Sequence, residues 1–268
     1  MNSDIPNIYD ARACYNKYGT YDSSAFGSFS RYSPAYTVSN EPLHWEMSLI
    51  PHPKDVLTVA GSGDQALFYT ISGAKHIDTF DISYCAHVIQ DVKTTAIRNM
   101  VPYYDYRTLL QELHRRSDVM QVREIIPILN HIPPTSLDFL MNMRGCRIFD
   151  MGENPFFSYN NIPRINYKSM SKTVPESFNF MWSDILSLHT KLTRTYDVIN
   201  LSNIFDYLTP QQRNWAISNL YPFLNIDGRI IFCKCDINYD KEKIRLQKHF
   251  NLFSPSIFTQ MAILQKIR

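Results

Sequence analysis

The residues best suited to bind a ligand lie in a short turn of small side chains. Residues 56–59 (Val-Leu-Thr-Val) are aliphatic or β-branched, and they predict a short buried strand. Gly61, Ser62 and Gly63 follow and predict a tight turn, in which the backbone can approach a ligand closely. Residues 66–71 predict a helix whose first N–H groups and positive dipole end face that ligand. The sequence therefore predicts a ligand site on this turn.

A carboxylate follows this turn at the sequence spacing found in nucleotide-binding folds. Residues 77–81 predict a second strand, which ends in Asp81. Nucleotide-binding βαβ units place an acid about 20 residues after their glycines, where it accepts hydrogen bonds from the ribose hydroxyls. Asp81 stands at that position, and we assign Ile82 and Ser83 to the same site. The pattern predicts the nucleoside-binding half of an α/β fold.

The turn leaves three interpretations of the ligand open. No Lys follows Gly63, so the turn is not a phosphate-binding loop of the type G-x-x-x-x-G-K-S/T. A dinucleotide fits, because Ala66 stands where the third glycine of G-x-G-x-x-G would be and the pattern tolerates Ala there. S-adenosylmethionine (SAM) also fits, since it presents a nucleoside and an amino acid but no phosphate. The third interpretation is a structural glycine turn in another kind of α/β protein.

Three short blocks of sequence resemble a known family. Residues 56–67 (VLTVAGSGDQAL), 80–83 (FDIS) and 93–97 (KTTAI) are similar to the SAM-dependent 3-amino-3-carboxypropyltransferases, whose best-known members act on diacylglycerol. That family has Val-Leu-Thr-Ile, a turn with Gly, Asn-Ala-Leu, and later Asp-Leu-Asn-Pro and a Lys-x-x-Ala-Ile helix. The resemblance covers roughly residues 55–97. It implies SAM as the cofactor, and transfer of either an aminocarboxypropyl or a methyl group.

This sequence agrees with the family pattern at one informative position and departs from it at others. Thr58 stands where class I methyltransferases usually carry an acid, and the aminocarboxypropyltransferases also lack that acid. Gln65 replaces the family's Asn, and residues 83–84 (Ser-Tyr) replace its Asn-Pro. These departures leave the identity of the transferred group open.

Two later strands are expected to contribute cofactor contacts. Asp184 and Ile185 follow a short predicted strand, at the place where class I SAM folds set a carboxylate against the adenine amino group. Asp184 could instead cap the helix that follows. Asn200 and Ser202 end another predicted strand, whose carboxyl end should lie at the switch crevice of the sheet.

Three residues are candidates for the catalytic step. Asp206 and Tyr207 follow the crevice strand and could accept a proton from the acceptor, although Asp206 could equally begin the helix predicted over residues 210–220. An Asp/Asn-Pro-Pro-Tyr motif, typical of methyltransferases that act on nucleobase amines or amides, does not occur there. Tyr36 is the third candidate.

Two regions flank or interrupt the predicted sheet. Residues 1–45 are rich in aromatic side chains and are expected to form a lid, in which Tyr36, Asn40 or Glu41 could contact the amino-acid end of SAM. Residues 101–146 predict helices, which we expect to cap the strand ends where the acceptor enters.

Smaller features lead to further expectations. His87 and Lys93 are expected to face solvent, and residues 238–250 to form a basic helix before a closing antiparallel strand pair. Cys233 and Cys235 share one face of a predicted strand and are expected to be core thiols rather than metal ligands.

Composition limits the class of protein. The chain has 268 residues, a length that suits one α/β domain over residues 1–268. Its net charge of +2 is too small to indicate nucleic acid as a partner. Five cysteines without paired spacing suggest reduced thiols, and no apolar signal core or membrane-length run occurs. We therefore expect a cytoplasmic protein that binds no metal, and the sequence does not indicate its oligomeric state.

The combined prediction is a doubly wound, Rossmann-like α/β domain of the class I SAM-transferase type, with an antiparallel last strand. Its expected reaction moves a 3-amino-3-carboxypropyl or methyl group from SAM to a small-molecule or lipid-like acceptor. A non-catalytic nucleoside-binding domain and an NAD(P)-dependent oxidoreductase are the alternatives.

Overall fold

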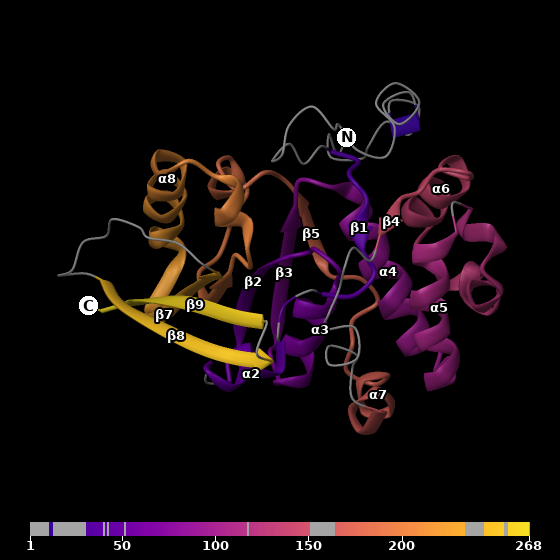
Figure 1. The fold of residues 1–268 in the computed structure, drawn as a ribbon, viewed down its shortest axis with the longest axis horizontal. Coiled ribbons are helices and arrows are strands. Elements are labelled where there is room, and N and C mark those ends of the chain that lie inside the picture. The colour runs from indigo at the N-terminus through magenta and orange to yellow at the C-terminus, as the bar shows by residue number, and fades with distance from the viewer. Residues whose placement is uncertain are drawn as a thin grey trace.

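The core of the protein is a mixed seven-stranded sheet, shown in Figure 1. The computed structural model describes residues 11–12, 31–39, 41, 43–50, 52–116, 118–150, 164–233, 244–254 and 257–267. The strand order is β5 (Asn179–Trp182), β3 (His76–Asp81), β2 (Asp55–Val59), β6 (Tyr196–Asn200), β7 (Leu224–Cys233), β9 (Ile257–Lys266) and β8 (Ile244–Ser254).

The direction of the strands confirms the predicted fold. The first five strands of this order are parallel, and β9 runs antiparallel to both β7 and β8. The chain leaves β2 toward β3 and β5 on one side, and β6 begins the other half of the sheet, so the topological switch point lies between β2 and β6. The structure is thus a doubly wound α/β sheet that ends in an antiparallel strand.

Helices cover both faces of this sheet because successive strand residues point to opposite sides. Val56 packs with Tyr69 of α3 (Asp64–Ile71), whereas Leu57 packs with Ile217 of α8 (Pro210–Leu220). Figure 1 shows α3 and α4 (Tyr84–Arg98) on one side of the sheet and α8 on the other. The other short elements around the sheet are α2 (Leu43–Ser48), η3 (Leu188–Thr190), η4 (Ile204–Tyr207) and η5 (Tyr221–Phe223).

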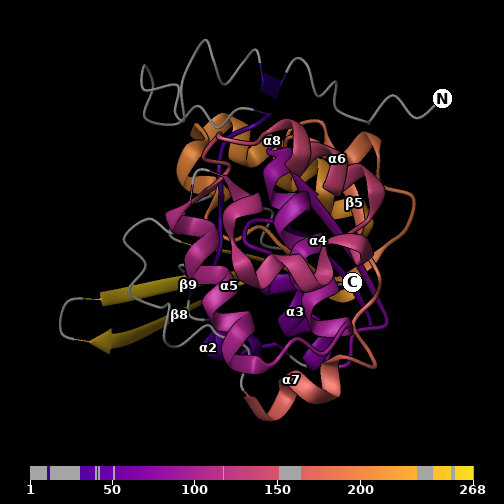
Figure 2. The ribbon, with the colours of Figure 1, turned by 90° about the vertical axis from the view of Figure 1, so that its right-hand side faces the viewer.

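The segment from 101 to 146 is helical, but it lies beside the sheet rather than over the strand ends. It contains α5 (Tyr103–Arg115), η1 (Val119–Gln121), η2 (Arg123–His131) and α6 (Pro134–Asn142). Leu109 and Phe139 share one core with Val88 and Val92 of α4, so the segment forms an outer layer on that helix (Figures 1 and 2). The remaining elements are a two-stranded parallel sheet of β1 (Ala35–Tyr36) and β4 (Phe149–Asp150), and α7 (Arg164–Met170).

The predicted exposure of His87 and Lys93 on α4 is wrong, because each of these side chains meets a partner from the sheet or from α3. Lys93 is fully buried, and its ammonium pairs with Asp64. The ring of His87 stacks on Phe180 with 4.5 Å between centroids, and its side chain is only 13% exposed. A lone amphipathic helix would turn these side chains to water, but α4 has packing partners on both sides.

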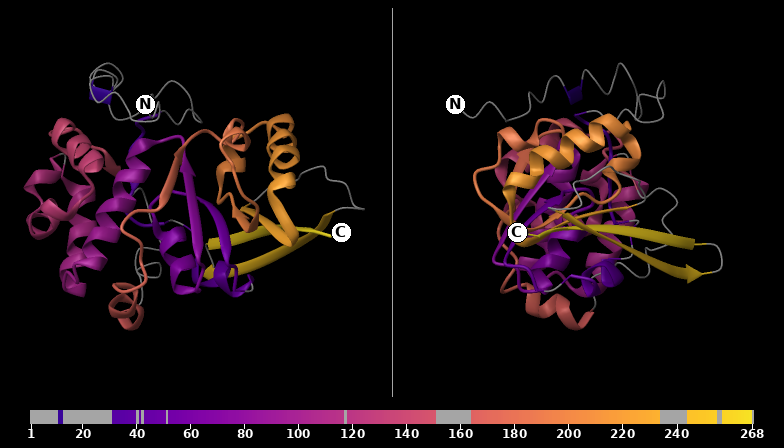
Figure 3. Two further views of the ribbon diagram at one scale, coloured as in Figure 1. Left: turned by 180° about the vertical axis from the view of Figure 1, so that it is seen from behind. Right: turned by 90° about the vertical axis from the view of Figure 1, so that its left-hand side faces the viewer.

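The predicted basic helix is also wrong where the structure describes it. Residues 244–254 form β8, which pairs antiparallel with β9. From Ile244 to Leu252 every second residue except Lys248 is apolar and the residues between them are polar, and this period of two is the strand signal that the count of basic residues obscured. Figures 2 and 3 show β8 and β9 projecting beyond the rest of the sheet.

Other expectations concern residues outside the described part of the chain. These include most of the predicted lid (Asn40 among its residues), Cys235 and residues 238–243. In the described part, no helix combines the length and the hydrophobicity that a bilayer crossing requires.

Candidate functional site

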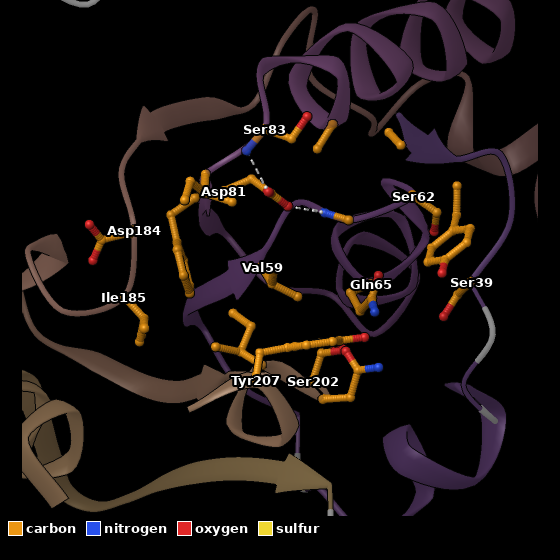
Figure 4. Close-up of a pocket in the computed structure, with 18 of the residues that line it drawn as sticks. Ser39, Val59, Ser62, Gln65, Asp81, Ser83, Asp184, Ile185, Ser202 and Tyr207 are labelled. Carbon is orange, nitrogen blue, oxygen red and sulfur yellow. Dashed lines mark hydrogen bonds between the residues drawn. The ribbon is translucent and has the colours of Figure 1, made fainter. Parts of the chain in front are cut away.

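A cavity of about 220 Å³ opens at the carboxyl ends of the central strands. Its lining residues come from segments 34–39, 59–65, 80–86, 183–185 and 202–208. The first segment contains β1, and the others lie at the carboxyl ends of β2, β3, β5 and β6. The cavity therefore lies at the switch point, where doubly wound sheets bind their ligands (Figure 4). No residue of segment 101–146 belongs to this lining, so its described helices do not form the expected cap.

The two glycines of the turn have different roles. Gly61 and Ser62 line the cavity, and Gly61 has a φ of 51°, a left-handed conformation that favours glycine. Gly63 lies behind the lining with a φ of 83°, and a Cβ there would stand 3.0 Å from Cγ of Gln90. Gly63 therefore allows the start of α3 to pack closely on α4. Of the three residues predicted to form the ligand-binding turn, Gly63 is the one that lies outside the cavity lining.

Asp81 lines the cavity and fixes the two turns beside it. One carboxylate oxygen accepts a hydrogen bond from the Gly61 N–H (2.9 Å) and the other from the Ser83 N–H (2.8 Å). Burial raises the pKa of Asp81 to about 6, against the effect of these amides. Each carboxylate oxygen has a further lone pair, so Asp81 can also accept bonds from a ligand's hydroxyl groups. Ile82 and Ser83 line the same wall.

Asp184 touches the cavity but its carboxylate is used elsewhere. One oxygen accepts hydrogen bonds from the N–H groups of Leu186 (2.6 Å) and Ser187 (3.1 Å). These residues form the turn before η3, whose N-cap is Ser187, so Asp184 closes a turn and does not cap the helix itself. In Figure 4 its carboxylate points away from the cavity, whereas Ile185 contributes an apolar side chain to the wall.

Ser202 and Asn200 lie at different depths. Ser202 lines the cavity with a φ of 53°, and its hydroxyl donates to Oε1 of Glu41 at 2.5 Å. Asn200 is fully buried beneath it, where its carbonyl oxygen accepts the Ser202 N–H (2.9 Å) and its amide donates to the Tyr69 hydroxyl (3.2 Å). Asn200 therefore supports the lining without belonging to it.

The structure separates the three catalytic candidates. Tyr36 and Tyr207 both line the cavity, whereas Asp206 lies outside the lining and is exposed. Tyr207 is itself 41% exposed, and its partial burial, with nearby Tyr36 and Asp206, raises its pKa. At neutral pH its hydroxyl can therefore donate a hydrogen bond but is a weak proton acceptor. The helix at 210 does not begin at Asp206 either, because Thr209 forms its capping box.

Gln65 lines the cavity, although the sequence did not predict it as a site residue. In the sequence it stood out only because it replaces the Asn of the resembled family. Its side-chain amide donates to Oε2 of Glu41 at 3.0 Å, which fixes the orientation of the amide group. Its carbonyl oxygen is buried without a hydrogen-bond partner, and Gln65 lines the cavity beside Ser62 and Ser39. Gln65 therefore keeps an unsatisfied acceptor at this end of the cavity (Figure 4).

A buried ion pair holds the wall around Gln65 in place. Nζ of Lys93 lies 2.6 Å from Oδ1 of Asp64. The other oxygen of Asp64 accepts hydrogen bonds from the Ser39 N–H (2.7 Å) and the Ser62 hydroxyl (3.0 Å). Burial lowers the pKa of Lys93, and Asp64 opposes this shift. The pair thus joins α4, the glycine turn and the segment before α2.

A second buried group lies behind Ser202 and Gln65. It contains Glu41, Glu46 and Cys233, and burial raises the pKa of all three. Cys233 is a buried free thiol, as predicted for this position.

The charge of the cavity limits the ligands that it can hold. Among the described residues that line it, none is Lys, Arg or His, and Asp81 supplies the carboxylate, because that of Asp184 points away. A lining of acids, amides, hydroxyls and apolar groups suits a ligand with positive charge better than one with several phosphates.

Comparison with known proteins gives structural similarities alone. No protein-family model and no curated protein matches the sequence. Among solved structures, an rRNA methylase from Streptococcus thermophilus aligns at 11% identity over 85% of this chain and 98% of its own, with a TM-score of 0.44. N-methyltransferase NodS from Bradyrhizobium japonicum, in complex with S-adenosylhomocysteine, aligns at 10% identity over 85% of this chain and 84% of its own, with a TM-score of 0.42.

Magnesium protoporphyrin IX methyltransferase from Synechocystis, with bound SAM, aligns at 10% identity over 99% of this chain and all of its own, with a TM-score of 0.41. These are similarities of general chain arrangement, so a function for this chain has to be inferred from its own site.

Proposed function

We propose that this protein is a SAM-dependent transferase that uses the cavity at the switch point. The observation that carries this proposal is the position of Asp81, whose carboxylate lies beside a glycine turn in a cavity that no basic residue lines in the described part of the chain. An acid at this position suits the hydroxyls of a ribose, and the absence of described basic side chains suits a sulfonium better than a pyrophosphate.

The cofactor would lie across the carboxyl ends of the strands. Asp81 would accept hydrogen bonds from the ribose hydroxyls, and the apolar side chains of Ile82 and Ile185 would pack beside the adenine. The amino-acid end would lie toward Gln65 and Ser202, where the carbonyl oxygen of Gln65 would accept a hydrogen bond from the α-ammonium group.

The reaction would be attack by an acceptor's nucleophile on one carbon of the sulfonium. Attack on the methyl carbon breaks its bond to sulfur and releases S-adenosylhomocysteine. Attack on the γ-carbon of the amino acid transfers the 3-amino-3-carboxypropyl group and releases methylthioadenosine. The protein selects the carbon by the direction from which it holds the acceptor. The resemblance over residues 55–97 favours the second outcome, with a small-molecule or lipid-like acceptor.

Tyr36 and Tyr207 would orient the acceptor through their hydroxyl groups. Both line the cavity, and the raised pKa of Tyr207 keeps its hydroxyl protonated at neutral pH. In this proposal they donate hydrogen bonds, and Asp206, which lies outside the lining, takes no proton from the acceptor.

Calorimetric titration of the purified protein with SAM, and separately with NAD and NADP, tests the choice of cofactor. We expect saturable binding of SAM and none of the dinucleotides. Incubation with SAM and candidate acceptors should then release S-adenosylhomocysteine or methylthioadenosine, and chromatography identifies which one. Binding of NAD or NADP in place of SAM would refute the proposal, and SAM binding without either product across acceptor classes would favour a binding domain.

A further inference from the structure

Three potential metal ligands meet in the interior behind the cavity wall. Glu41 lies just before α2, Glu46 lies on α2, and Cys233 ends β7. One oxygen of each carboxylate and the Cys233 sulfur all lie within 4.8 Å of one another. The three residues are 5%, 1% and 8% exposed, so water reaches none of them readily.

Glu46 differs from Glu41 and Cys233 in its hydrogen bonding to the described residues. Neither of its side-chain oxygens has a hydrogen bond to any described residue. The Asn200 side chain is near enough to affect Glu46, but it makes no hydrogen bond of ordinary geometry to it. The buried ammonium of Lys93 is bound to Asp64 and does not serve Glu46. An isolated buried carboxylate is costly, so proteins keep it protonated, pair it or use it to coordinate a metal.

The spacing of the other two ligands suits a single ion. Oε1 of Glu41 accepts a hydrogen bond from the Cys233 thiol at 3.7 Å, and a metal ion would replace the proton of that thiol. In a tetrahedral zinc site, with bonds of about 2.1 Å to oxygen and about 2.3 Å to sulfur, two such atoms lie about 3.6 Å apart. Glu41 also accepts hydrogen bonds from Gln65 and Ser202, but each carboxylate oxygen has more than one lone pair.

We propose that Glu41, Glu46 and Cys233 bind one divalent transition-metal ion beneath the cofactor cavity. A thiolate among the ligands favours Zn²⁺ or a similar ion over Mg²⁺ and Ca²⁺, which take oxygen ligands. Three protein ligands leave a fourth position for water. The ion would fix Glu41, and through it the two cavity residues Gln65 and Ser202 that are labelled in Figure 4. This inference does not depend on SAM as the cofactor.

Titration of the chelator-treated full chain with Co²⁺, without SAM, tests the proposal. Cobalt bound to a thiolate gives a charge-transfer absorption in the near ultraviolet, and Zn²⁺ should displace it. We expect one equivalent of Co²⁺ to produce this band, and Zn²⁺ to raise the melting temperature. Cys233→Ser should abolish the band, whereas Cys146→Ser, which removes another buried free thiol, should retain it.

Glu46→Gln provides a variant that should fold even if Cys233→Ser does not, because it keeps the side-chain shape and removes a buried charge. We expect it to weaken Co²⁺ binding at least about tenfold, since even outer-shell changes have effects of that size. The proposal is wrong if the unmodified chain shows neither the band nor the rise in melting temperature, or if the band persists unchanged in Cys233→Ser. Unchanged Co²⁺ affinity in folded Glu46→Gln would equally overturn it.

Discussion

The two ends of the cavity are built in different ways. At the Asp81 end, both carboxylate oxygens accept main-chain N–H groups, from Gly61 and from Ser83 two residues away. At the opposite end, Glu41 accepts side-chain hydrogen bonds from Gln65 and from Ser202, which is 161 residues away in the sequence. One end therefore depends on local backbone geometry, and the other on side chains that only the complete fold brings together.

This difference implies that the two ends respond differently to substitution. A change at Asp81 should affect chiefly the bound ligand, because the turns that it contacts belong to neighbouring strands of a buried sheet. A change in the network around Asp64 should affect folding, because that network holds separate segments in the interior. The predictions below follow this distinction, in order of decreasing expected effect.

Lys93→Met should have the largest effect, and the effect should be on stability. It leaves the buried Asp64 carboxylate without its cation, so the free energy of unfolding should fall by about 3–5 kcal/mol. Urea unfolding followed by circular dichroism measures this change. Arg116→Met, which breaks the exposed pair with Glu112, is the control and should cost less than about 1 kcal/mol. Equal urea midpoints for Lys93→Met and Arg116→Met would show that the buried Lys93–Asp64 pair does not stabilise this end of the cavity.

Asp81→Ala should weaken SAM binding about 100-fold. Hydrogen bonds to a charged group contribute roughly 1.5–3 kcal/mol each, and the substitution removes those that the ribose hydroxyls would make. Calorimetric titration at pH 7.5 gives the affinity. Asp184→Ala is the matched control, since that carboxylate bonds to main-chain N–H groups, and it should bind SAM almost as the unmodified chain does. Affinity in Asp81→Ala equal to that of the unmodified protein would refute the placement of the ribose.

The affinity for SAM should fall about tenfold between pH 7 and pH 5. The pKa of Asp81 is raised to about 6, so the carboxylate is mostly ionised at pH 7 and mostly protonated at pH 5. The ionised form is the better acceptor for ribose hydroxyls, and binding therefore weakens as the pH falls through 6. Titrations at a series of pH values should show this step in the unmodified chain and lose it in Asp81→Ala. A step of the same size in both proteins would assign the titration to another group.

Gln65→Leu should have the smallest effect among these substitutions, about tenfold on SAM affinity. A hydrogen bond to a charged group contributes roughly 1.5–3 kcal/mol, and the substitution removes a single acceptor offered to the ammonium group, for which we expect the lower figure. Methylthioadenosine lacks the amino acid, so its affinity should not change in this variant, whereas Asp81→Ala should weaken both ligands. Equal losses for the two ligands in Gln65→Leu would show that Gln65 does not contact the amino-acid end.

The same contrast explains what could be predicted from the sequence. The first strand, the glycine turn and Asp81 could be predicted because they are close in sequence and their spacing reflects local geometry. The antiparallel last strand followed from the same pattern of strands and helices, and the structure confirms it.

The other end could not be predicted in this way, because its partners are far apart in sequence. Nothing near Lys93 indicates that it would meet Asp64 inside the protein, so helical periodicity alone predicted exposure. The separation of Glu41 and Cys233 by 192 residues likewise hides their contact. The helices of segment 101–146 could be predicted from the sequence. Their position against α4 could not, because it depends on which face of α4 the rest of the fold leaves uncovered.

A crystal structure of the full chain grown with SAM tests the central claim most directly. We predict that SAM fills the cavity, with its ribose hydroxyls within hydrogen-bonding distance of Asp81 and its amino group beside Gln65. Density for SAM at another place, or a cavity that stays empty at saturating SAM, would contradict the account.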